Sequence, residues 1–257
     1  MIRRALVWSA AGVALVFLAL PIVAIFARSS FGHLSSSVVT DALLVSLKTT
    51  VAAQALVLLL GTPTAWVLAT HRFPGRSLVV TLVELPIVLP PAVAGIGLLA
   101  AFGRVGLLHT GLPFTQTAVI VAVAFVSGPL YVRQAIAAFE AVDDTLVAAS
   151  RTLGAGPMKT FFRVVLPLAR GGLGAGEALA FARGLGEFGA TIMFAGSLQG
   201  VTQTLPLAVY QEFDVDFRLA VSLGGLLVLI SAVLLVTLKW LASSSTSAFR
   251  FALSSSS

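Results

Sequence analysis

Residues 140–170, EAVDDTLVAASRTLGAGPMKTFFRVVLPLAR, form a polar and basic stretch in a chain that is otherwise hydrophobic. Hydrophobic residues make up 58% of the 257 residues, and charged residues only 10%. Apolar runs of about 20 residues, the length that crosses a bilayer, lie on both sides of the stretch. A membrane protein that keeps a compact, patterned segment outside the lipid is expected to use it to contact another molecule.

The first half of this segment has the pattern of a short helix. Asp143 and Asp144 favour a helix start, because carboxylates accept hydrogen bonds from the free amides of a first turn. A helix is predicted over 145–153, with Gly154 and Gly156 ending it. From this pattern alone, an ordinary surface helix in a loop is the simpler interpretation.

The composition of the chain excludes several classes of protein. A mean hydropathy of +1.04 is too high for a soluble domain, because so much apolar surface cannot be buried in one core. The sequence has no cysteine and three widely separated histidines, so we expect no disulfide and no metal site. The net charge of +6 comes from basic residues scattered between apolar runs, which does not indicate nucleic-acid binding.

These patterns predict an all-α membrane protein, since the alternating pattern of a membrane barrel is absent. The first apolar run is longer than the core of a signal peptide, so a retained span is expected, with a cleaved signal peptide as the alternative. The polar tail, 242–257, is expected to be irregular. Within a transmembrane domain covering 1–241, the predicted spans are 5–27, 49–70, 78–102, 117–138, 172–195 and 220–241.

The distribution of Lys and Arg predicts the orientation. With the N-terminus inside, eleven of these residues lie on the cytoplasmic side and four outside, with Arg183 within a span. Such a bias places both termini and the segment 140–170 in the cytoplasm. The four on the outer side are Arg28, Lys48, Arg104 and Arg218.

Two of the predicted spans carry unusual residues. The third contains Pro86, Pro90 and Pro91, which bend a helix, and this fits either a helix that lines a pathway or a kink needed for packing. The fifth carries a stripe of small residues that lets another helix approach closely. The stripe consists of Gly172, Gly176, Ala180 and Gly184.

Glu187 is the charged residue most in need of a partner inside the membrane, where an isolated carboxylate costs roughly 2.5–3.5 kcal/mol. Arg183 lies four residues earlier, so the two can pair along one helix face. The pair is interpreted either as structural or as facing a transport pathway or a dimer. Ser127 and Thr191 could offer hydroxyls to a passing anion, although such hydroxyls more often bond their own backbone.

The segment 140–170 resembles the EAA loop of ABC-transporter permeases. The pattern of that loop is Glu-Ala-Ala, three residues, Gly, nine residues, Ile, one residue and Leu-Pro. Ala148 replaces the leading glutamate, and Val164 stands for the isoleucine. The other matching residues are Ala149, Ser150, Gly154, Leu166 and Pro167.

Two further stretches resemble the molybdate and sulfate permeases of this family: LPIVLPPAVAGIGLLAAFGRVGLL (85–108) and FARGLGEFGATIMFAGSLQGVTQTLPLAVY (181–210). The second stretch is closer to the molybdate branch. The resemblance therefore implies a six-helix type I ABC importer permease for molybdate or tungstate, in a prokaryotic plasma membrane. Its coupling helix would dock on an ATPase through Asp143, Asp144, Ala149, Ser150, Leu153, Gly154, Ala155, Leu166 and Pro167.

The resemblance also implies the partners. They are a second copy of the permease, two cytoplasmic ABC ATPase subunits and an extracytoplasmic oxyanion-binding protein, with membrane lipid around them. The permease would be non-catalytic and bind no cofactor, with ATP and magnesium on the ATPase; the sequence contains no Gly-x₄-Gly-Lys-Ser/Thr motif. The alternatives are a sulfate or thiosulfate ABC permease and a secondary anion transporter that works without ATP.

Overall fold

The computed structural model describes residues 2–30, 32 and 36–254, and all the regular elements in them are helical. Most are α-helices, and one short element, η2, is a π-helix. The elements are α1 (Ile2–Arg28), α2 (Ser37–Thr70), α3 (Arg76–Val88), α4 (Pro91–Phe102), α5 (Gln116–Glu140), α6 (Asp144–Thr152), α7 (Pro157–Thr160), η2 (Phe161–Val165), α8 (Leu166–Leu185), α9 (Gly189–Ala195), α10 (Leu205–Val215) and α11 (Phe217–Ser254).

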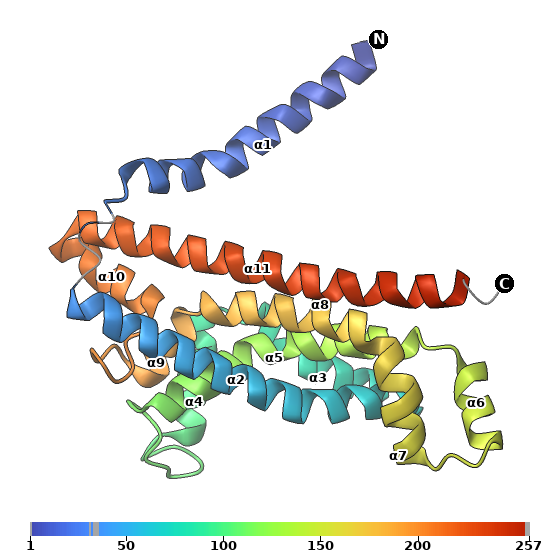
Figure 1. Cartoon of the computed structure of the whole chain (residues 1–257). Helices are drawn as coiled ribbons and strands as arrows, with labels where there is room; N and C mark the ends of the chain where they lie inside the picture. Colours follow the sequence, from blue (N-terminus) through green and yellow to red (C-terminus); the bar gives the residue numbers. More distant parts are fainter. Residues whose placement is uncertain (1, 31, 33–35, 255–257) are drawn as a thin grey trace.

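The long helices run between two ends of a bundle (Figure 1). Helices α2, α5 and α8 pack on one another at its centre, and α11 runs along α8. The short helices α6 and α7 lie at one end, which we call the α6 end, while α4, α9 and α10 lie at the other. Helix α1 stands apart from the bundle and contacts α11 near its own C-terminus.

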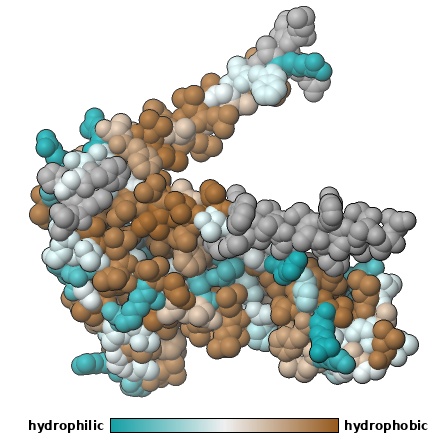
Figure 2. All heavy atoms as spheres, in the orientation of Figure 1, coloured by the Kyte–Doolittle hydropathy of each residue, from teal (hydrophilic) through white to brown (hydrophobic). Residues whose placement is uncertain are grey.

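The predicted membrane fold is confirmed. Among the residues that the structure describes, five helices are long and apolar enough to span a bilayer, and the bent pair α3 and α4 makes a sixth if it counts as one span. Hydrophobic side chains cover much of the surface of the bundle and of α1 (Figure 2). Because exposing so much apolar surface to water is unfavourable, these faces are suited to contact with lipid or with another apolar surface.

The predicted third span is broken more sharply than a proline kink. Helices α3 and α4 meet at an angle of 115° over a break at Leu89 and Pro90. A proline forces the residue before it out of the helical region, and the pair Pro90–Pro91 does this to two successive residues. Leu89 and Pro90 both have extended backbones, with ψ angles of 134° and 132°. Pro91 then starts α4, where its missing N–H costs nothing.

The predicted fifth span, 172–195, is wrong in its boundaries. The continuous helical run covers Pro157–Leu185, and a break at 186–188 separates it from α9. Gly186 at the start of the break and Gly189 directly after it make the backbone easy to bend. Glu187 accepts a hydrogen bond from the amide of Ala190 at the start of the next helix. The stretch 172–195 is apolar on average, so its composition gave no sign of this break.

Three other boundaries also differ from the sequence prediction. Helix α2 begins at Ser37, twelve residues before the predicted start, because its polar residues find partners; the Oγ of Ser46, for example, accepts from the amide of Leu205 at 2.7 Å. Helix α10 lies between the predicted fifth and sixth spans, where the sequence predicted no helix. Helix α11 continues to Ser254, through most of a tail expected to be irregular, in which no glycine or proline interrupts it.

The glycine stripe of α8 works as predicted. A Cβ on Gly172 would lie 2.5 Å from the Cβ of Ala138, and one on Gly176 would lie 2.8 Å from the Cβ of Gln134. Both neighbours belong to α5, so the missing side chains allow α5 and α8 to pack in close contact. This contact holds α8, and with it the segment that precedes α8, firmly against the centre of the bundle.

Candidate functional site: the α6 segment and the intramembrane ion pair

Helix α6 begins at a well-formed cap. The carboxylate of Asp143 accepts a hydrogen bond from the amide of Thr145 at 2.8 Å, and this bond lowers the pKa of Asp143 below its ordinary value. Asp144 occupies the first turn, where its negative charge faces the positive end of the helix. The predicted helix 145–153 is therefore present, displaced by one residue at each end.

The end of α6 is equally defined by its sequence. Gly154 has a positive φ of 81°, a conformation that a side chain disfavours. Its amide donates to the carbonyl of Arg151 at 2.9 Å, and the amide of Ala155 donates to the carbonyl of Ser150 at 3.1 Å. These two bonds form a Schellman motif, which terminates the helix and fixes the direction in which the chain leaves it.

Helix α6 is fastened to the bundle along one face. The Oγ of Ser150 lies 2.9 Å from the Oγ1 of Thr160, a buried residue of α7, and Val147 packs on the core cluster shared by α2, α5 and α8. Leu166 packs on the same cluster. Any displacement of α6 is therefore transmitted to α7 and to the start of α8.

The junction between α7 and α8 is a π-helical turn, η2. The amide of Leu166 donates to the carbonyl of Phe161, five residues earlier. Pro167 follows immediately and has no N–H to donate, so the wider turn accommodates it without breaking the helix. The Leu-Pro pair thus lies where the α6 segment passes into α8.

The opposite face of α6 is open. Leu153 is 88% exposed at the C-terminal end of the helix, and Ala149 and Gly154 are also exposed. An apolar side chain so exposed on a rigid element is a good anchor for a pocket in a partner protein. The α6 segment can therefore act as a knob that docks into a partner and transmits its movement.

Within the bundle, the predicted ion pair is present. The Nη1 of Arg183 lies 2.7 Å from the Oε2 of Glu187, whose side chain is almost completely buried. The Oε1 of Glu187 accepts from the amide of Ala190 at 2.7 Å. Glu187 therefore joins α8 to α9 across the break as well as pairing with Arg183, a second role that the sequence did not indicate.

Arg183 also lines a cavity of about 240 Å³ at the break between α3 and α4. Leu89 lines it from the break, Pro91 from the start of α4, and Val126 and Leu130 from α5. Arg183 is the only charged residue that lines this cavity in the described part of the chain. One cation in an apolar recess can attract an anion, although its pairing with Glu187 weakens that attraction.

The two candidate hydroxyls lie elsewhere. The Oγ of Ser127 donates to the carbonyl of Val123 in its own helix and accepts from the side-chain Nε2 of Gln54. Gln54 is a buried residue of α2 that the sequence did not single out. Thr191 is fully buried on α9, beyond the break that separates it from Arg183. Neither residue lines the cavity beside Arg183. Ser127 thus bonds the backbone of its own helix, which was the alternative to offering its hydroxyl to a passing anion.

Comparison with known proteins points to a transport role. Residues 58–243 match the family described as binding-protein-dependent transport system inner membrane component. The chain is 44% identical over 235 residues to the molybdenum transport system permease protein ModB of Mycobacterium tuberculosis, covering 86% of this chain and 88% of that protein. It is 33% identical over 245 residues to the probable sulfate transport system permease protein cysT of Nephroselmis olivacea, covering 90% and 86%.

The architecture also matches a solved transporter. A chain of a bacterial ABC transporter involved in the import of the acidic polysaccharide alginate superposes with a TM-score of 0.72, covering 95% of both chains at 14% sequence identity. At this identity the match establishes the fold of a type I importer permease and nothing about cargo.

Proposed function

Because this chain belongs to the family of binding-protein-dependent transport system inner membrane components, we propose that it is the permease subunit that carries molybdate or tungstate into the cytoplasm. The observation that carries this proposal is the 44% identity to a molybdenum permease over most of both chains. The sulfate alternative has weaker support, since the similarity to the sulfate permease is 33%. A secondary transporter fits poorly with a family named for dependence on a binding protein.

In this proposal, two copies of the chain span a prokaryotic plasma membrane, with both termini and the α6 end in the cytoplasm. Two ATPase subunits bind ATP and magnesium, and each binds the α6 segment of one permease copy. An extracytoplasmic oxyanion-binding protein delivers the cargo at the opposite end of the bundle. When the ATPases close, α6 moves, and the fastening through Ser150 and Thr160 transmits the movement to α8. The permease itself performs no catalysis.

The breaks at 89–90 and 186–188 support alternating access. Each divides a span into two parts that can move separately, and the ion pair of Arg183 and Glu187 lies where the two breaks approach each other. Gly189 confirms this proximity, because a Cβ there would lie 2.5 Å from the Cβ of Pro91. A movement of α8 therefore reaches α4 through α9, and the cavity beside Arg183 lies on this path.

The cargo assignment predicts a defined order of competition. We expect ATP-driven uptake of radiolabelled molybdate, measured in proteoliposomes with the matching ATPase and binding protein, to be inhibited strongly by tungstate and weakly by sulfate. Tungstate matches molybdate in charge and closely in size, whereas sulfate is smaller. Inhibition by sulfate as strong as that by tungstate, together with uptake of labelled sulfate, would reassign the permease to sulfate.

A further inference from the structure

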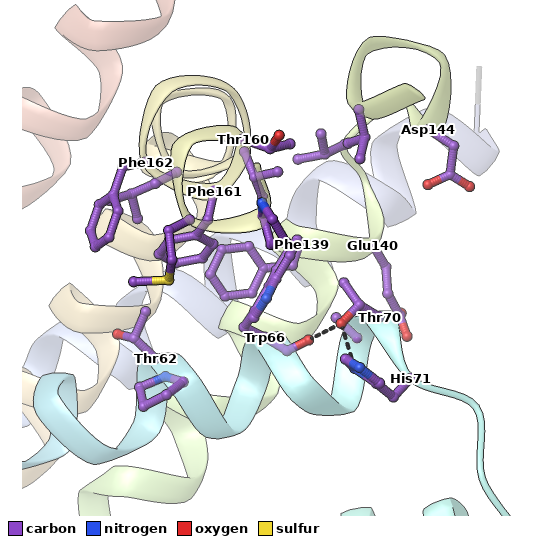
Figure 3. Close-up of a pocket in the computed structure, with 18 of the residues that line it drawn as sticks. Thr62, Trp66, Thr70, His71, Phe139, Glu140, Asp144, Thr160, Phe161 and Phe162 are labelled. Carbon is purple, nitrogen blue, oxygen red and sulfur yellow. Dashed lines mark hydrogen bonds between the residues drawn. The ribbon is translucent and has the colours of Figure 1, made fainter. Parts of the chain in front are cut away.

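A groove of about 1620 Å³ opens at the α6 end of the bundle (Figure 3). The C-terminal half of α2 forms one side of it, and α6, α7 and η2 form the other. The coupling role proposed above uses the exposed tip of α6 at Leu153, which does not line this groove. Of the residues expected to dock on the ATPase, only Asp144 and Leu166 line the groove, so most of its lining has no role in that docking.

The two ends of the groove differ in chemistry. Trp66, Phe139 and Phe161 pack on one another with ring centroids 5.1–6.0 Å apart, and Phe162 continues this aromatic cluster (Figure 3). Leu58 and Leu59 extend the apolar lining along α2. The other end is polar and includes His71, Arg72, Arg76, Glu140, Asp144 and Arg151.

Two of these arginines are available to a ligand. Arg76 is committed, because its Nη2 lies 2.6 Å from Glu140 and its Nε donates to the carbonyl of Leu68. Arg72 and Arg151 are exposed and form no ion pair with any residue that the structure describes. Asp144 opposes them with one negative charge, which leaves the polar end with an excess of positive charge.

The length of the groove fits one leaflet of a bilayer. Leu58 lies twelve residues before the end of α2 at Thr70, a rise of about 18 Å along the helix. Half of a hydrocarbon core of about 30 Å is a similar distance. A soluble ATPase cannot reach apolar residues at that depth, whereas the acyl chains of a lipid lie there already.

We infer that this groove binds an anionic phospholipid of the cytoplasmic leaflet, with acyl chains against Trp66, Phe162 and Leu58 and the phosphate beside Arg72 and Arg151. Basic pockets between helices at the cytoplasmic surface are suited to such headgroups. The inference relies on the proposed orientation of the α6 end. A lipid in this position fills the space between α2 and the α6 segment, so it would support the coupling helix from behind.

The test uses Trp66 as a fluorescent probe. The full-length chain, with Trp8 and Trp240 replaced by Phe, is placed in nanodiscs of phosphatidylcholine that contain a small fraction of lipid with brominated acyl chains. We expect brominated phosphatidylglycerol to quench Trp66 at a lower fraction than brominated phosphatidylcholine. Removing either arginine should reduce this preference roughly fivefold, since each contributes about 1 kcal/mol at a surface.

The variants are Arg72→Gln and Arg151→Gln, both at exposed positions, and the matched control is Lys159→Gln. Lys159 lies on α7 at the same end of the bundle but does not line the groove. Equal loss of the preference in the control would mean general attraction of anionic lipid to a basic surface, and would overturn the site. So would equal quenching by the two lipids, or no quenching by either, as expected if a second copy of the chain fills the groove. These outcomes do not depend on transport, which is assayed separately.

Discussion

Leu153→Asp is expected to abolish ATP-driven uptake while leaving the permease folded. Leu153 is 88% exposed, so the free protein loses almost no packing when it is replaced. Burying a leucine against a partner contributes about 1.5–3 kcal/mol, and a carboxylate in the same pocket adds a desolvation cost. The ATPase should therefore bind roughly 100-fold more weakly or worse. The measurement is retention of the ATPase subunits during purification, together with uptake in proteoliposomes.

Val105→Asp is the matched control for this experiment. Val105 is 99% exposed but lies in the loop after α4, at the opposite end of the bundle from α6. The same chemical change there should leave the ATPase bound. If the Leu153→Asp protein kept its ATPase and its uptake, the exposed tip of α6 would not be the docking contact.

Arg183→Ala is expected to damage folding severely, because it leaves the carboxylate of Glu187 buried without a countercharge. Breaking a buried pair by removing one partner typically costs about 3–5 kcal/mol. The side chain of Glu187 is only 1% exposed in the intact protein, where its carboxylate is partnered by the guanidinium of Arg183 and the amide of Ala190. The yield of folded protein in membranes and its thermal stability in detergent should both fall.

The double variant Arg183→Ala/Glu187→Gln distinguishes the two interpretations of the pair. Glutamine removes the charge but keeps an oxygen that can accept from the amide of Ala190. Folding should recover relative to Arg183→Ala alone. If uptake recovers as well, the pair is structural; if uptake stays low in a stable protein, Arg183 acts on the anion beside the cavity it lines. If the stability losses of Arg183→Ala and of Glu187→Gln, each measured alone, simply add up in the double variant, the two residues are not energetically coupled.

The sequence predicted best where local signals decide the structure. The start of α6 depends on Asp143 and its end on Gly154. Each of them forms its hydrogen bond with a residue only two or three positions away in the sequence. The glycine stripe of α8 was equally readable, because a four-residue spacing of small residues defines a helix face. These features required no knowledge of the rest of the fold.

The breaks in the third and fifth spans were harder to predict. Pro90 and Pro91 indicated a bend, but the angle of 115° depends on how α4 packs against α9. The break at 186–188 lies in an apolar run, and Glu187 stabilises it by accepting from an amide three residues later. The cavity beside Arg183 could not be predicted at all, since its lining comes from four helices and the break between α3 and α4.

The most direct test of the coupling account is uptake by proteoliposomes that contain the permease and its binding protein, with and without the ATPase. The account predicts molybdate uptake only when the ATPase is present and ATP is supplied on the side of the membrane that bears α6. Uptake at the full rate by the permease without any ATPase would contradict it, because α6 would then have no movement to transmit.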